Sequence, residues 1–334
     1  MHMVTDGLCS FLIFSRLYTE NPELVAITFI GYNTLAFVTQ SPVGAIIDKY
    51  NKPKLFLSIS VALMLLGYLF GGVCILAVLF IGIGNSLFHV AGGKYVTDKS
   101  GNDIAHLGIF VSTGAFGLCL GQIYCNLAFL PYIFFALLIG SFVLILILPD
   151  AETKSYPEHF SPAGCERYAM LAVMAVVLIR SFVGKTVTAD YEQTELLLII
   201  VALATTLGKA MGGIVSKLIG MRLTTLISMS VAAICLTLGT STPYAYILGV
   251  LAFNFSMPIT LYLANVILKG REGFAFGTLA AILTPGYFIA MSFTYSLAMR
   301  IATAFMCLLT VIIIFIASKR IKNADKALID NNIS

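Results

Sequence analysis

The sequence predicts an all-α integral membrane protein, with twelve transmembrane helices arranged as two pseudo-symmetric six-helix bundles. The first observation is composition: 59% of the 334 residues are hydrophobic, 11% are charged, and the mean hydropathy is +0.96. Soluble domains carry roughly a quarter charged residues. The second observation is a series of apolar runs that continues along the whole chain, and the third is a polar turn that is repeated near half-length. Together they predict a protein that crosses a membrane many times.

The apolar runs set the expected elements, because a helix needs about 20 apolar residues to cross a bilayer. The turns at Gly71-Gly72 and Ser241-Thr242-Pro243 carry no charge, so ten or eleven spans remain alternatives. Breaks at charged residues, Gly or Pro predict spans over residues 2–19, 23–47, 54–71, 73–94, 104–125, 129–149, 168–185, 195–216, 222–240, 243–268, 273–296 and 298–318.

Basic residues indicate the orientation. With the N-terminus in the cytoplasm, 15 Lys and Arg residues fall on the cytoplasmic side, 3 fall outside and 2 lie within spans. Cytoplasmic loops are enriched in Lys and Arg, so both termini are expected in the cytoplasm. The outer residues are Arg16, Lys185 and Arg300; the cytoplasmic ones are Lys49, Lys52, Lys54, Lys94, Lys99, Lys154, Arg167, Lys217, Arg222, Lys269, Arg271, Lys319, Arg320, Lys322 and Lys326.

Residues 150–166 indicate how the domains are divided. This polar stretch contains Pro157 and Pro162 and is predicted to be a cytoplasmic linker. It separates an N-terminal bundle over 1–149 from a C-terminal bundle over 167–318, and 319–334 form a polar cytoplasmic tail. The seven cysteines have no C-x-x-C spacing and are expected to be small buried residues. No metal site, cofactor or nucleotide-binding loop is expected.

A polar segment from Gly44 to Lys54 follows the second predicted span, and a similar segment from Gly208 to Arg222 appears about 169 residues later. Gly44 permits close helix approach at the end of a span. Asp48 can accept hydrogen bonds from the free N–H groups that open the next helix. In the second copy, Lys217 stands where the acid would be.

This pair of segments resembles the loops between helices two and three, and between helices eight and nine, of major facilitator superfamily transporters. The first copy has Pro53 within the basic run. The resemblance covers essentially the whole chain and implies alternating access between two bundles. It also implies a gating latch on the cytoplasmic side, formed by Gly44, Asp48, Lys49, Lys52, Gly213, Lys217 and Arg222.

Ionisable residues within spans are candidates for function, because each is costly in a bilayer. His2 and Asp6 are four residues apart and share one helix face. Asp6 suits proton exchange. The alternatives are that its side chain extends to the headgroups, or that it pairs with a neighbouring helix and has no role in transport. His89 precedes Gly92 and Gly93, and the glycines allow close approach to its imidazole, although a buried polar helix contact is an alternative.

Two further cations lie within spans of the second half. Arg180 must face water, an acid or an anionic substrate, and Glu192 or Glu195 could neutralise it. Lys209 lies nearer the predicted cytoplasmic side, where its long side chain can extend to the headgroups; a role in substrate binding is the less favoured alternative.

A second resemblance concerns the first and fourth spans. His2 and Asp6 with the Gly82 to Gly93 segment around His89 are similar to the fosmidomycin-resistance-like branch of the superfamily, although Val90 stands where the branch has Pro. That branch consists of proton-driven exporters in bacterial inner membranes. Gly114, Gly117 and Gly121 resemble the superfamily's antiporter motif and predict a smooth helix face, but Gln122 replaces its Pro.

These patterns predict a secondary transporter rather than an enzyme. It would move a small organic molecule, with an anion favoured, by proton-coupled efflux through a monomer in the lipid bilayer. Proton-symport or uniport import of an organic anion is an alternative, and a non-transporting receptor is a less favoured one. No nucleic-acid partner is expected, because the basic residues lie in short loops. The candidate substrate and proton site is Asp6, His89, Arg180, His2 and Gln122, with helix breaks at Pro258 and Pro285.

Overall fold

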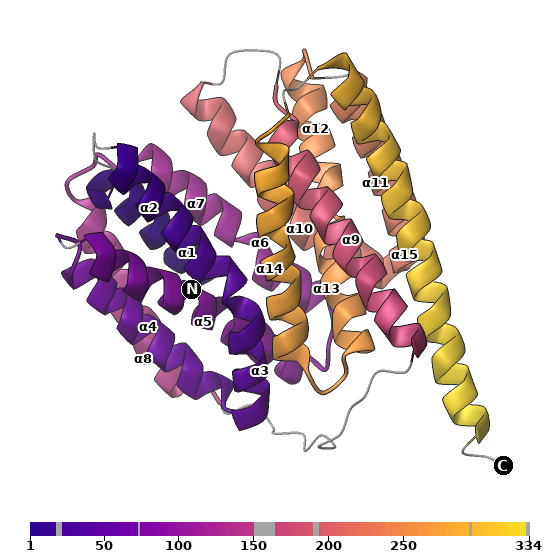
Figure 1. Cartoon of the computed structure of the whole chain (residues 1–334), viewed down its shortest axis with the longest axis horizontal. Helices are drawn as coiled ribbons and strands as arrows, with labels where there is room; N and C mark the ends of the chain where they lie inside the picture. The colour runs from indigo at the N-terminus through magenta and orange to yellow at the C-terminus, as the bar shows by residue number, and fades with distance from the viewer. Residues whose placement is uncertain are drawn as a thin grey trace.

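The computed structural model describes residues 1–17, 22–72, 74–149, 164–189, 194–238, 240–293 and 296–331, and its regular elements are all helices (Figure 1). The predicted linker falls mostly on residues 150–163, outside this range. The side chains of Arg16, of residues 164–166 and of residues beyond 319 also lie outside it.

The described residues of the first half form eight α-helices and two short π-helical stretches. Pro53 and Pro131 occupy first-turn positions, where Pro costs no hydrogen bond. The elements are α1 (His2–Leu12), η1 (Ile13–Leu17), α2 (Pro22–Asn33), η2 (Thr34–Val38), α3 (Gln40–Tyr50), α4 (Pro53–Leu69), α5 (Cys74–Ser100), α6 (Ile104–Ser112), α7 (Gly114–Ile123) and α8 (Leu130–Ile147).

Seven α-helices make up the second half within the described ranges. Thr194 caps α10 through its hydroxyl, and Gly220 turns the chain into α11 with a φ of 87°, which favours glycine. The elements are α9 (Gly164–Thr186), α10 (Glu195–Ile219), α11 (Met221–Leu238), α12 (Pro243–Phe253), α13 (Ser256–Ile267), α14 (Glu272–Ala290) and α15 (Leu297–Asn331).

Nine helices of the described chain are long and apolar enough to cross a membrane by length and composition. Two shorter apolar helices, His2–Ser15 and Pro53–Leu69, accompany them. The protein is thus a multi-pass membrane protein. Some elements follow one another almost directly along the chain and are counted here as one helical rod. When α1 is joined with η1, α2 with η2 and α3, α6 with α7, and α12 with α13, the described elements form twelve rods.

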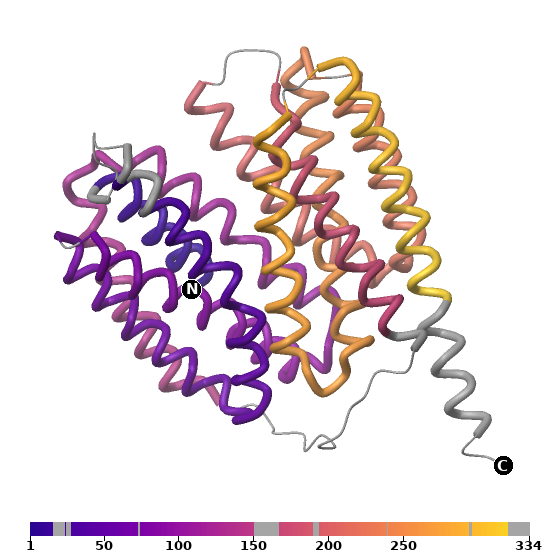
Figure 2. The backbone as a smooth tube through the Cα atoms, in the orientation of Figure 1, coloured from indigo at the N-terminus to yellow at the C-terminus, as the bar shows by residue number. Residues whose placement is uncertain are grey.

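Two groups of helices make up the molecule, and they converge at one end. In Figure 1, most of α1 to α8 lie on the left and α9 to α15 on the right. The halves meet near the lower edge, where α3 packs against α14 and α6 packs against α10. The tube in Figure 2 shows the upper ends diverging. We call the converging end, at which α8 ends and α9 begins, the linker side.

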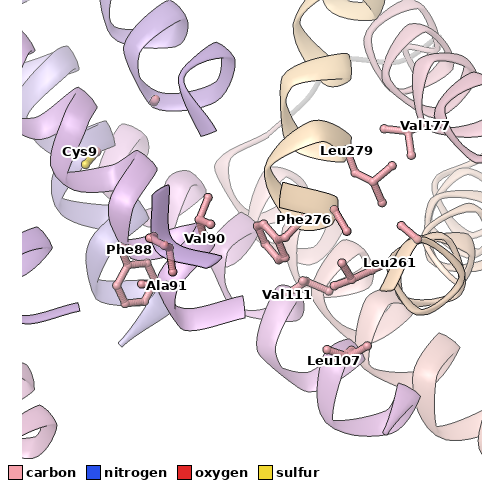
Figure 3. Packing of buried hydrophobic residues seen from close by; sticks show 14 of the residues in the cluster. Cys9, Phe88, Val90, Ala91, Leu107, Val111, Val177, Leu261, Phe276 and Leu279 are labelled. Atoms are coloured by element: carbon pink, nitrogen blue, oxygen red, sulfur yellow. The ribbon is translucent and has the colours of Figure 1, made fainter. Parts of the chain in front are cut away.

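A shared apolar core closes the linker side of the interface. Figure 3 shows Phe276 of α14 between Val90 of α5 and Val111 of α6. The Phe276 ring contacts Gly93 and lies 6.1 Å from the ring of Phe110 between centroids. One hydrophobic cluster therefore extends across both halves.

Several predicted boundaries change in the structure. The segment from Gly44 to Tyr50 is helical, so the turn shrinks to Asn51 and Lys52, with Asn51 in the left-handed region. Helix α5 continues to Ser100, six residues beyond the predicted end. Helix α14 passes through Pro285 without a break, whereas the break at residues 254–255 precedes Pro258. Helix α15 continues to Asn331, so it includes most of the region expected to be a polar tail.

The described cysteines are free. Cys9 and Cys307 are buried, as expected, whereas Cys74, Cys119, Cys125 and Cys235 are only half-buried. The side chain of Cys165 lies outside the described residues.

Candidate functional site

Three candidate side chains from two helices meet at one point. His2 and Asp6 extend from α1, and His89 extends from α5. The two Nε2 atoms are 2.8 Å apart. The Asp6 carboxylate lies 3.2 Å from Nε2 of His2 and 3.4 Å from Nε2 of His89. We call these three residues the triad, and we note that His2 and Asp6 are each less than 10% exposed.

Backbone and amide groups hold the triad in place. Nδ1 of His2 lies 2.6 Å from the carbonyl oxygen of Phe110, and Nδ1 of His89 lies 2.9 Å from that of Asn85. A carbonyl only accepts, so both Nδ1 atoms donate and both neutral imidazoles present an Nε2 lone pair to the centre. The amide of Asn85 donates to Asp6 at 3.1 Å. The sequence reading missed Asn85, which lies one turn before His89.

Glycines of α7 leave the room that the triad occupies. A Cβ on Gly114 would collide with the carboxylate of Asp6 and the imidazole of His2. Gly117 and Gly121 lie directly against the carbonyls of Met3 and Gly7 in α1. The predicted smooth glycine face in this span is confirmed, and its partner is α1.

Two cations face the triad from the other half. Arg180 of α9 and Lys209 of α10 line a cavity of about 290 Å³ together with His2, Asp6 and His89. Its wall includes residues between Phe29 and Gln40 on α2 to α3, and residues between Phe276 and Leu283 on α14. Apart from the charged and histidine side chains, the lining is mostly apolar and includes Ile13, Phe14, Tyr32, Phe37, Val111, Leu118, Met257, Leu261, Leu279 and Ala280.

Arg180 has a neutral hydrogen-bond partner. Arg180 donates to the hydroxyl of Thr260 at 3.1 Å, not to Glu195, and Glu192 lies outside the described residues. Within the part of the chain that the structure describes, neither Arg180 nor Lys209 forms an ion pair with a carboxylate. Lys209 lies on the cavity wall rather than extending to the headgroups, which corrects the sequence interpretation. Thr260 had no sequence signal beyond its position in an apolar run.

One predicted site residue lies elsewhere. Gln122 is exposed near the end of α7, and it is not among the residues that line the cavity. It follows the buried glycine face by one position, which turns its side chain away from α1.

On the linker side, Asp48 joins the two halves. Its carboxylate accepts hydrogen bonds from the backbone N–H groups of Gly273 at 2.9 Å and Phe274 at 2.7 Å. The predicted chemistry at a helix start is present, but the helix is α14 of the other half and not the next helix, α4. Gly44 allows this contact, since a Cβ there would collide with the backbone of Gly273.

Lys94 adds an ionic connection that the sequence reading missed. It was expected at the cytoplasmic end of the span over residues 73–94, but it is 1% exposed within α5. Its Nζ lies 3.5 Å from Asp48, 3.4 Å from Asp98 and 3.5 Å from Glu272, which begins α14. A buried ammonium therefore bridges acids of both halves.

The second copy of the repeated segment forms a different contact. Gly213 packs against the carbonyl of Ile104, and Lys217 pairs with Asp103. Asp103 also caps α6 by accepting from Ala105 and His106. The hydrogen bond from Lys217 lowers the pKa of Asp103 to about 2. The acid that is absent from the second copy is thus supplied by the other half.

The remaining latch candidates do not bridge the halves in this structure. Lys49 is exposed and lies 5.9 Å from the ring centre of Tyr50, its neighbour in sequence. Lys52 is also exposed. Arg222 donates to Ser318 at 2.7 Å, within the second half.

No protein-family model matches the sequence, and no curated protein matches it. Solved structures do match. The fucose:proton symporter of E. coli has a TM-score of 0.68 at 13% identity, covering 95% of both chains. The human organic anion transporter MFSD10 has a TM-score of 0.65 at 13% identity, covering 94% of this chain and 98% of the other. An outward-facing bacterial homologue of the iron transporter ferroportin has a TM-score of 0.57 at 13% identity, covering 97% of both.

These structures are of transporters and not of enzymes. A second structure of the fucose symporter, described as a major facilitator superfamily transporter in the outward conformation, gives a TM-score of 0.65 at 13% identity over 95% of this chain and 98% of the other. Two helical halves, a repeated segment at their junction and a cavity between them fit this likeness. The chain therefore has the fold of major facilitator superfamily transporters.

Proposed function

We propose that this protein is a secondary transporter of the major facilitator superfamily that moves a small organic anion by alternating access. The observation that carries the proposal is the cavity between the halves, where Arg180 and Lys209 face the triad. Ionisable groups in a membrane core are costly and are retained where they serve transport. The apolar remainder of the wall suits a substrate with a hydrocarbon body.

The charges of the cavity favour an anion. Arg180 and Lys209 form no ion pair with a carboxylate in the described part of the chain, so a bound carboxylate or phosphate would compensate both. A guanidinium offers a paired set of donors that matches either group. The name of one similar structure, a human organic anion transporter, is consistent with this substrate class.

Proton coupling is assigned to the triad. Three acceptor groups, one carboxylate and two imidazole Nε2 atoms, face one another there, so a proton shared between Asp6 and the imidazoles relieves their repulsion. The fosmidomycin-resistance-like pattern of His2, Asp6 and His89 favours export. Import by proton symport or uniport is the alternative. One of the similar structures is a fucose:proton symporter, so the direction of transport needs a test.

In the membrane, we assign all twelve rods as spans of a monomer, in two six-helix bundles. The positive-inside pattern supports cytoplasmic termini in a bacterial inner membrane. The linker side is then cytoplasmic, and the structure is the outward-facing state. Asp48, Lys94 and Glu272 act as the cytoplasmic latch, with Lys217 and Asp103 as its counterpart.

The test is flux in proteoliposomes that contain a pH-sensitive dye, challenged with benzoate, succinate and glycerol phosphate and with cationic controls. We expect anion-evoked proton movement. Asp6→Asn should abolish the proton signal. Arg180→Gln should weaken the apparent affinity for the anion roughly 10- to 100-fold, as expected for losing a charge-assisted hydrogen bond of about 1.5–3 kcal/mol. Lys319→Gln, an exposed basic residue at a distance from the cavity, is the matched control.

The outcomes separate the alternatives. Anion flux without proton movement, unchanged by Asp6→Asn, would leave a uniporter. Flux that increases with an inward proton gradient would select symport. An absence of flux for every compound, in protein that remains folded, would contradict the proposal and favour a receptor.

A further inference from the structure

We propose that the triad binds a divalent first-row transition-metal ion, with Zn²⁺ preferred, at the wall of the central cavity. His2, Asp6 and His89 each offer one ligand atom, and these atoms lie within 4.8 Å of one another. Binding of the ion requires no transport, so this inference goes beyond the proposed function and does not depend on it.

The spacing of the carboxylate and the two imidazoles is close to that of metal ligands. Zn–N and Zn–O bonds are about 2.0–2.2 Å long, and two ligands at a tetrahedral angle are then about 3.3–3.6 Å apart. Oδ2 of Asp6 lies 3.2 Å from Nε2 of His2, and Oδ1 lies 3.4 Å from Nε2 of His89, so each oxygen is near this distance from one imidazole. Coordination requires the two Nε2 atoms, now 2.8 Å apart, to separate by about half an ångström, and requires the carboxylate to turn one oxygen toward the ion.

The hydrogen bonds prepare both imidazoles for coordination. A metal-binding histidine usually donates its other N–H to a carbonyl or carboxylate, which fixes the tautomer. His2 does so to Phe110, and His89 does so to Asn85. The same Asn85 donates through its side chain to Asp6. One residue therefore orients two of the three ligands.

The site also has an open side. All three ligands line the cavity, and Gly114 beside them adds no side chain to its wall. A fourth position is thus available for water or for an anion held opposite by Arg180 and Lys209. Two imidazoles among three ligands favour Zn²⁺, Co²⁺ or Fe²⁺ over Mg²⁺ and Ca²⁺, which prefer oxygen.

The experiment uses the full chain, purified in detergent with a tag that lacks histidine and stripped with a chelator. Co²⁺ is titrated while its visible absorption is followed, and Zn²⁺ is then added as a competitor. We expect one Co²⁺ per chain, displaced by Zn²⁺ and unaffected by excess Mg²⁺. His89→Gln and Asp6→Asn should remove the absorption band. Asn85→Leu should weaken the affinity about 10- to 100-fold, as outer-shell changes do.

The matched control is His106→Gln, which removes an exposed imidazole on the linker side and should leave Co²⁺ binding unchanged. Zn²⁺ should raise the unfolding temperature of wild type and of His106→Gln but not of His89→Gln, and this also reports whether each variant folds. Wild-type protein that shows no Co²⁺ band would overturn the inference, whatever the variants do. So would a band that persists in His89→Gln. Neither result bears on anion flux, so failure here is distinguishable from failure of the proposed function.

Discussion

At the scale of single residues, the triad depends on glycine at position 114. Asp6 and His2 occupy the space that a side chain at this position would fill, and a methyl group there would displace both. Gly140 of α8 provides a contrast, since a Cβ added at that exposed position meets nothing within 4 Å. Comparing the two glycines separates an effect of the site from an effect of adding a methyl group to a helix.

We therefore expect Gly114→Ala to reduce anion flux at least 10-fold and to lower stability by about 1–3 kcal/mol, as overpacking does. Gly140→Ala should retain flux. Flux in proteoliposomes and thermal unfolding in detergent are the measurements. Full activity of Gly114→Ala would mean that the triad geometry is not needed for transport.

The sequence indicated His2, Asp6 and His89 because ionisable residues in apolar runs are conspicuous, and a family resemblance grouped them in one candidate site. Their direct contacts with one another were not predictable, because these depend on the rotation of α1 against α5. Asn85 and Thr260 were missed for a different reason: a neutral polar residue in a span is common and carries little signal. Lys209 was assigned to the headgroups because depth in the membrane was counted along the chain and not from the packing.

At the scale of elements, the two copies of the repeated segment close the linker side with unequal strength. Asp48 is partly buried and accepts two backbone hydrogen bonds from α14 beside the buried Lys94. Lys217 is 55% exposed and pairs with Asp103. Exposed ion pairs contribute about 0–1 kcal/mol, whereas hydrogen bonds to charged groups contribute about 1.5–3 kcal/mol.

We expect Asp48→Asn to shift the population toward opening on the linker side by at least 10-fold, and Lys217→Gln to shift it by no more than about fivefold. Spin labels at Tyr50 and Lys269, both exposed on that side, report the distance between the halves. Equal shifts in the two variants would contradict the asymmetry.

The ion pair between Lys217 and Asp103 is expected to weaken only at low pH. The pKa of Asp103 is lowered to about 2 by the hydrogen bond from Lys217, so its contribution is present above the ordinary Asp pKa of about 3.9 and is lost as the pH falls toward 2. The effect of Lys217→Gln should accordingly be the same at pH 5 and at pH 8 in the spin-label measurement. A difference between these two pH values would mean that another group governs the contact.

At the scale of the whole molecule, the all-helical membrane fold was predictable because composition and span length leave few alternatives. The repeat of Gly44 to Lys54 indicated where the halves meet. The partner of Asp48 was not predictable: a local reading places the cap on the following helix, whereas the fold brings α14 to it from more than 220 residues away. Contacts between the halves depend on how the helices pack, and a single sequence does not indicate which residues of the two halves meet.

The interface between α3 and α14 allows a direct test of alternating access. Ser41 of α3 and Thr278 of α14 are joined by a hydroxyl contact of 3.1 Å, between backbones that Gly44 and Gly277 allow to approach. In a background without the seven native cysteines, Ser41→Cys with Thr278→Cys should form a disulfide that holds the linker side closed. Alternating access then predicts less than a tenth of the normal anion flux, restored by dithiothreitol. Co²⁺ binding, in contrast, should survive the disulfide, since the triad lies on the cavity side of the lock. Undiminished flux through fully oxidised protein would contradict alternating access at this interface, whereas each single-cysteine variant should transport normally under both conditions.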